Sequence, residues 1–124
     1  MALVNKNSRM SHETLLVLST CPAADASRLA RALVEARLAA CVNIVGGIES
    51  HYVWEGKLEA SSESLLVCKT TCERFAALRD GLLALHPYKL PEIVALDVVD
   101  GHVPYLDWVR AEVGSPPLER EAPG

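Results

Sequence analysis

A long β-hairpin signal in the middle of the chain constrains its fold more than any other feature. Over residues 41–54 apolar and polar side chains alternate with a period of two, which is typical of a β-strand. Glu55-Gly56-Lys57 then has the composition of a tight turn, and the alternation returns over residues 58–70. At the rise of an extended chain, a strand of about 13 residues reaches about 43 Å. We therefore expect a sheet whose longest element is this hairpin.

The alternation in the first hairpin strand predicts two chemically different faces. One side carries apolar and aromatic residues, and the other carries polar ones. The apolar set is Val42, Ile44, Ile48, Tyr52 and Trp54, and the polar set is Asn43, Glu49 and His51. Gly46-Gly47 interrupts the pattern and indicates a β-bulge.

Shorter elements flank the hairpin. A buried strand is expected over residues 14–19, and a helix of about four turns follows from Pro22. After the hairpin, Thr70-Thr71-Cys72-Glu73 fits a capping box and predicts the start of a second helix. The expected buried stripe of that helix is Phe75, Leu78, Leu82 and Leu85.

The last strand and helix complete the order of secondary-structure elements along the chain. Pro87 ends the second helix, and a strand over residues 93–99 and a short helix from Pro104 to Gly114 follow. This order predicts an α+β, ferredoxin-like βαββαβ sandwich with an extended β-hairpin and a C-terminal helix. We expect both crossover helices on one face of the sheet, and the first and last strands near each other.

The chain has 124 residues, which is the size of one domain. We place that domain at residues 12–114. Residues 1–11 are expected to be a flexible N-terminal extension, and residues 115–124, which contain three prolines, a flexible tail.

The lengths of the strands predict self-association. The outer strands offer only about 6 or 7 residues, so much of the hairpin lacks a partner within its own chain. Its tip carries Tyr52, Val53 and Trp54, which favour burial against another subunit. In the alternative, the hairpin bends at Gly46-Gly47 and stays in solvent. Polar residues of the second strand are compatible with that alternative, namely Glu59, Ser61, Ser62 and Glu63.

Composition excludes several classes of partner. The chain carries 12 basic and 16 acidic residues, a net charge of -4, and no basic stripe, so we expect no nucleic-acid partner. No apolar run approaches the roughly 20 residues of a membrane helix, and no secretory signal is recognisable. We expect a cytoplasmic protein without a membrane partner.

The cysteine spacing fits neither a zinc knuckle nor a redox pair. No catalytic motif is present, so we expect no enzyme.

Several motifs together resemble the CutA family of divalent-cation tolerance proteins over about residues 14–110. They are LAACVNI at 38–44, SHYVWEGK at 50–57, KTT at 69–71, HPY at 86–88 with PEI at 91–93, and YLDW at 105–108. The resemblance implies a homotrimer similar in architecture to PII signalling proteins. It also implies a response to metal ions, through copper or another divalent cation.

The resemblance implies only part of a metal site. The family pattern has Cys at the end of the first strand and a double His before Pro-Tyr, whereas this chain has Ser19 and Leu85-His86. The candidate metal ligands that remain are His86, Glu92 and Cys21, and they predict weak binding. In the alternative, His86 interacts with the end of its helix instead of a metal.

A second implied site is a cleft between subunits that binds a small polar ligand. Its candidate residues are Lys69, Tyr88, Glu92, Trp54 and Tyr105. In the alternative, Lys69 and Glu92 form an ion pair that fixes a loop, and the aromatic residues pack at an interface. Two functions follow, a trimeric protein that binds divalent metal ions or a PII-like trimer that binds a small effector.

Overall fold

The computed structural model describes residues 13–119, so the predicted extension 1–11 and residues 120–124 of the predicted tail lie outside the described residues. The elements are β1 (Thr14–Cys21), α2 (Ala23–Glu35), β2 (Cys41–Trp54), β3 (Lys57–Thr71), α3 (Cys72–Leu85), β4 (Val94–Asp97) and α4 (Val103–Val113). The strands form one antiparallel sheet in the order β2-β3-β1-β4. This confirms the ferredoxin-like α+β arrangement, with β1 beside β4 as expected.

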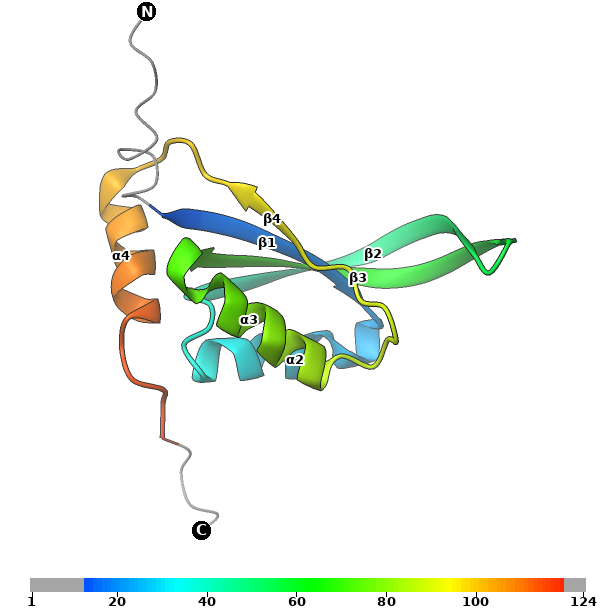
Figure 1. Cartoon of the computed structure of the whole chain (residues 1–124), viewed down its shortest axis with the longest axis horizontal. Helices are drawn as coiled ribbons and strands as arrows, with labels where there is room; N and C mark the ends of the chain where they lie inside the picture. The colour runs from blue at the N-terminus through cyan, green and yellow to red at the C-terminus, as the bar shows by residue number, and fades with distance from the viewer. Residues whose placement is uncertain (1–12, 120–124) are drawn as a thin grey trace, which may run out of the picture.

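Helices α2 and α3 cover one face of the sheet, and α4 lies at the end remote from the hairpin (Figure 1). The core fills the space between the two helices and the sheet. Its fully buried members include Val17, Leu29, Leu33, Leu66, Leu78 and Leu82. The second helix therefore buries two residues of its predicted stripe, while Phe75 is partly buried against the core. The prediction for Leu85 was wrong, because this last residue of α3 is 39% exposed.

The hairpin projects beyond the rest of the sheet, as predicted (Figure 1). Strand β3 pairs with β2 from Lys57 to Lys69, interrupted only at the bulge, but it pairs with β1 only from Ser64 onward. The turn places Glu55 at φ 51° and Gly56 at φ 78°, and two consecutive left-handed residues match the twist of a hairpin. Among residues 13–119, the part of β3 before Ser64 therefore has β2 as its one strand neighbour.

The predicted bulge is present, and it changes which residues share a face. The register shifts by one residue between Val45 and Ile48, where Gly47 adopts φ 72°. Val45 pairs with Leu65, whereas Ile48 pairs with Glu63. Ile48, Tyr52 and Trp54 consequently lie on the face opposite Val42 and Ile44. The prediction of one continuous apolar side was wrong, because the extra residue reverses the alternation.

Two other local predictions were also wrong. The predicted capping box does not form, because α3 has no side-chain cap and the Thr70 hydroxyl donates instead to the carbonyl oxygen of Leu38, at 2.7 Å. The last strand covers Val94–Asp97 instead of residues 93–99, because its register with β1 extends only from Leu15 to Leu18.

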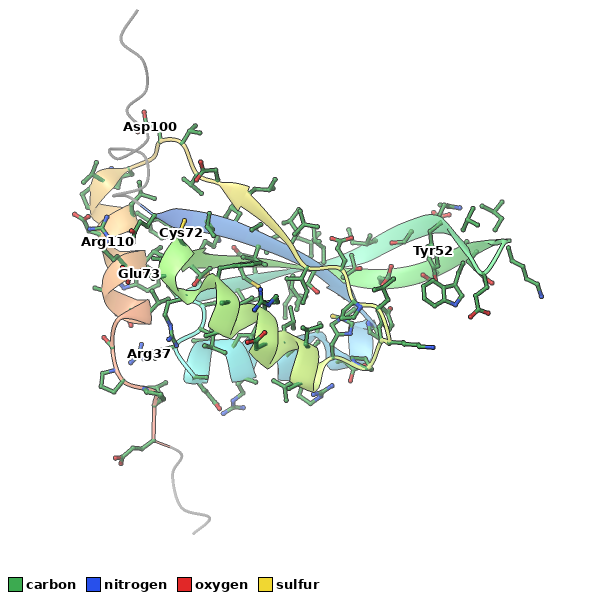
Figure 2. The ribbon with its side chains drawn as sticks, in the orientation of Figure 1. Arg37, Tyr52, Cys72, Glu73, Asp100 and Arg110 are labelled. Carbon is green, nitrogen blue, oxygen red and sulfur yellow. The ribbon has the colours of Figure 1, made fainter. Side chains whose placement is uncertain are left out.

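The start of the predicted tail makes contacts with the domain. Arg37 forms an ion pair with Glu112 of α4, and its Nε donates to the carbonyl oxygen of Pro116 at 3.1 Å. The backbone N–H of Leu118 donates to the carbonyl oxygen of Glu35 at 2.9 Å. Figure 2 shows Arg37 beside the segment that follows α4. Within residues 13–119, no helix is long and apolar enough to cross a bilayer.

Candidate functional site

His86 connects the end of α3 to the end of β1. Its backbone N–H donates to the carbonyl oxygen of Leu82 at 2.8 Å, which completes the last helical turn. Its ring Nδ1 accepts the backbone N–H of Tyr88 at 3.1 Å. Because Nδ1 is an acceptor, Nε2 carries the ring proton and donates to the carbonyl oxygen of Thr20 at 2.8 Å. The buried imidazole thus fixes the direction in which the chain leaves α3.

The loop that leaves His86 places Tyr88 against β3. Its hydroxyl donates to Oε2 of Glu63 at 2.7 Å, and its ring packs on that of His86 with centroids 4.7 Å apart. Burial raises the pKa of Tyr88, and its hydrogen bond to the Glu63 carboxylate raises it further. Tyr88 therefore remains a hydrogen-bond donor across the physiological pH range.

A cavity of about 950 Å³ lies where the hairpin leaves the sheet, between the hairpin and this loop. We call it the hairpin cleft. Strand β3 contributes Ser61 and Glu63, and the loop contributes Tyr88 and Glu92. The hairpin side includes Tyr52 and Trp54, and Figure 2 shows Tyr52 on the projecting part of the hairpin. A cavity with aromatic walls and a few polar groups is typical of a small-molecule site.

The structure brings together three of the five predicted cleft residues. Trp54, Tyr88 and Glu92 line the hairpin cleft, but Lys69 and Tyr105 do not. Lys69 follows Glu63 by six positions, or about 20 Å along β3. In the single chain, Lys69 and Tyr105 contact neighbouring residues outside the hairpin cleft.

Lys69 and Tyr105 both have neighbours close at hand. The Lys69 ammonium donates to Oδ1 of Asn43 and lies 3.9 Å from Sγ of Cys41. The alternative of a Lys69–Glu92 ion pair does not form within residues 13–119. Tyr105 packs against Trp108 on α4, with ring centroids 5.6 Å apart.

The predicted metal ligands do not form a ready site in the single chain. Both ring nitrogens of His86 already have backbone partners. Cys21 is fully buried, and burial, followed by the nearby charge of Asp25, raises the pKa of its thiol and disfavours the thiolate that metals prefer. In the described part of the chain, no three His, Cys, Asp or Glu side chains are arranged to hold a metal ion. Metal binding by this set would require rearrangement.

Glu63 is a site residue that the sequence did not reveal. Its polar neighbours on the hairpin made it compatible with a solvated strand, yet it is 6% exposed. The loop of Tyr88 and the bulge near Gly47 place it at the cleft, and both depend on contacts between distant parts of the chain. The pairing of Ile48 with Glu63 can be predicted only if the bulge is known to contain one extra residue.

Comparison with known proteins gives a consistent result. A family model described as "CutA1 divalent ion tolerance protein" matches residues 15–112. The divalent-cation tolerance protein CutA of Thermus thermophilus is 50% identical over 100 residues, which cover 80% of this chain and 97% of that protein. Human protein CutA is 49% identical over 92 residues, which cover 73% of this chain but only 51% of the human protein.

Solved structures agree with these sequence comparisons. The divalent cation tolerance protein of T. thermophilus superposes with a TM-score of 0.78 at 49% identity, covering 80% of this chain and 97% of that one. A structure described as the PII-like protein CutA from Nostoc sp. PCC 7120 superposes with a TM-score of 0.77 at 33% identity, covering 80% and 96% of the two chains.

Proposed function

The chain belongs to the CutA1 family of divalent ion tolerance proteins, and from this premise we propose that it acts in divalent-cation tolerance as a homotrimer that binds a small ligand in the hairpin cleft. The observation that carries the ligand-binding part is the cleft itself, in which Trp54, Tyr88 and Glu92 converge on one cavity. A binding role, in place of an enzymatic one, agrees with the description of the family as tolerance proteins.

The open face of the sheet supports self-association. This face points away from α2 and α3, and it carries apolar side chains from all four strands. Its half-buried members are Leu16, Leu18, Leu65 and Val67, and its exposed members are Val45, Val94 and Leu96. An apolar sheet face of this kind favours an obligate interface. The number of three subunits comes from the PII-like architecture that the family resemblance implies.

We place this trimer in the cytoplasm. All four cysteines are free, and two of them, Cys21 and Cys68, are buried in the core. Free thiols persist in reducing compartments, whereas paired cysteines are typical of oxidising ones.

A second candidate function is direct but weak binding of copper or another divalent cation. It is favoured by the family to which the chain belongs and by the closeness of two donors, since His86 bonds the residue that precedes Cys21. Glu92, on the loop that follows His86, supplies the third donor. Because His86 must give up a backbone hydrogen bond to bind a metal, we expect a dissociation constant no tighter than about micromolar.

Native mass spectrometry of the full chain purified without chelator tests both candidates. The proposal predicts a mass of three chains together with a bound small molecule. Three chains with a stoichiometric metal ion would favour the second candidate, provided that His86→Ala removes the ion. Metal retained by His86→Ala would move the metal site away from these donors. A monomer or dimer at micromolar concentration would contradict the trimer.

A further inference from the structure

A buried carboxylate without a counter-charge lies in the hairpin cleft. Glu63 accepts one hydrogen bond, from Tyr88 to Oε2, and it forms no ion pair with any residue from 13 to 119. A carboxylate can accept about four hydrogen bonds, so most of its capacity is unused. Burying a charge without compensation is unfavourable, and proteins generally neutralise it with an opposite charge.

The surroundings of Glu63 indicate the kind of charge that is missing. Trp54, Tyr52 and Tyr88 line the same cavity, and the faces of aromatic rings attract cations. Glu92 adds a second carboxylate to the lining. The cleft therefore combines aromatic walls with excess negative charge.

Two basic residues also line the cavity, but neither compensates Glu63. His51 is bonded to Glu49 at 2.8 Å, on the exposed surface of the hairpin. Lys89 is exposed, so water screens its ammonium group, and it makes no ion pair with Glu63. Glu92 is exposed in the same way, so Lys89 and Glu92 offset each other, and the buried carboxylate of Glu63 leaves the cleft with a net negative charge.

We propose that the hairpin cleft binds a small organic cation, such as an amine, a quaternary ammonium or a guanidinium compound. Its charge pairs with Glu63, and its carbon atoms lie against Trp54 and Tyr52. This proposal rests on the proposed function, in which the cleft is a ligand site. An anion would be repelled by the buried carboxylate. A bare metal ion would find one buried carboxylate and no group of three donors among the described residues.

According to the proposal, the buried charge of Glu63 destabilises the fold when no ligand is bound. Replacing it by Gln removes the charge but keeps an oxygen that accepts the Tyr88 hydroxyl. Without ligand, Glu63→Gln should therefore melt at the same temperature as the wild type or higher. Glu59→Gln is the matched control, because Glu59 is an exposed carboxylate on the same strand and does not line the cleft.

The test measures thermal shift and calorimetric binding on the full-length oligomer. The probes are agmatine, choline and tetramethylammonium, compared with succinate, ATP and Cu(II). We expect at least one organic cation to raise the melting temperature of the wild type. Its affinity should fall at least tenfold in Glu63→Gln and severalfold in Trp54→Ala, and it should not change in Glu59→Gln.

Other outcomes would overturn the proposal in distinguishable ways. Binding of succinate or ATP, without any organic cation, would refute the ligand class and leave the cleft as a ligand site. Binding of Cu(II) alone, lost in Glu63→Gln, would replace the organic ligand with a metal. If no probe binds and Glu63→Gln lowers the melting temperature, the counter-charge comes from a neighbouring subunit, and the ligand site of the proposed function fails as well.

Discussion

The ring Nε2 of His86 lies 2.8 Å from the carbonyl oxygen of Thr20, and this hydrogen bond joins the end of α3 to the end of β1. The second ring nitrogen accepts the N–H of Tyr88. The His86 imidazole therefore connects α3 to β1 and also positions the loop that lines the hairpin cleft. A metal could bind His86 in the single chain only if one of these two hydrogen bonds were broken.

Substitution of His86 should destabilise the fold. His86→Ala leaves a buried carbonyl oxygen and a loop N–H without partners, so we expect a loss of about 2 kcal/mol in the free energy of unfolding. Urea denaturation at fixed protein concentration measures it. His86→Gln should recover part of the loss, because its amide nitrogen reaches a position similar to Nε2. An unchanged midpoint in His86→Ala would contradict a structural role.

The hydrogen bond between Tyr88 and Glu63 should be strongly coupled. Tyr88→Phe removes the hydroxyl that donates to the buried carboxylate of Glu63, and we expect it to cost about 2 kcal/mol of stability. In a Glu63→Gln background the same substitution should cost about 0.5 kcal/mol, because no charge is left unpaired. A double-mutant cycle by chemical denaturation gives the coupling energy. Equal losses in both backgrounds would show that the charge of Glu63 is unimportant to this bond.

Most of the fold could be predicted because it depends on local patterns. Alternation identified the hairpin, and the compositions of Glu55-Gly56-Lys57 and Gly46-Gly47 identified its turn and its bulge. The capping box failed for a tertiary reason, since Thr70 donates to Leu38, 32 residues away along the chain. A short sequence cannot show that a capping hydroxyl has a better partner elsewhere.

The site was harder to predict than the fold. Trp54, Tyr88 and Glu92, which were grouped because the motifs that carry them belong to a recognised family pattern, line one cavity of the single chain. Glu63 was missed, because its burial follows from a one-residue bulge and from a loop 25 residues farther along the chain. Lys69 was predicted to line a cleft between subunits, and in the single chain it lies beside Asn43, outside the hairpin cleft.

Two fully buried hydroxyl groups should respond in opposite ways to removal. The Ser19 hydroxyl has no hydrogen-bond partner in the part of the chain that the structure describes, whereas the Thr70 hydroxyl donates to the carbonyl oxygen of Leu38. Ser19→Ala should raise the free energy of unfolding by about 1 kcal/mol, because it removes a buried polar group that gains nothing. Thr70→Val should lower it by about 1–2 kcal/mol. Thermal and urea denaturation of the two variants measure these changes in the free energy of unfolding. Destabilisation by Ser19→Ala would show that the Ser19 hydroxyl has a hydrogen-bond partner.

The open sheet face should control assembly. Leu96 is 45% exposed on β4, and we expect it to be buried between subunits in the trimer. Leu96→Glu should dissociate the trimer, because an unpaired carboxylate is strongly unfavourable in an apolar interface. Leu83→Glu is the control, since Leu83 is similarly exposed but lies on α3, on the other side of the sheet. Analytical ultracentrifugation distinguishes them, and an intact Leu96→Glu trimer would place the interface elsewhere.

The Cys68 thiol should make the protein sensitive to alkali. Burial raises the pKa of this thiol from its usual 9.0 to about 12, and the neighbouring Cys41 adds to the rise. Below pH 9 both the folded and unfolded chains carry the proton, so the thiol has no effect on pH dependence. Between pH 9 and about 12 only the folded chain retains it. Stability should therefore fall as pH rises through this window, by about 1.4 kcal/mol per unit.

Cys68→Ala isolates this contribution from the other groups that titrate in alkali. The lost packing of the thiol destabilises the variant by the same amount at every pH, so only the slope is compared. We expect the wild type to lose about 2 kcal/mol more than Cys68→Ala between pH 9 and pH 10.5, measured by urea denaturation at fixed protein concentration. Cys72→Ala serves as the control for a thiol at the surface, because Cys72 is exposed. Parallel slopes for the wild type and Cys68→Ala would mean that the folded chain releases the Cys68 proton as readily as the unfolded chain.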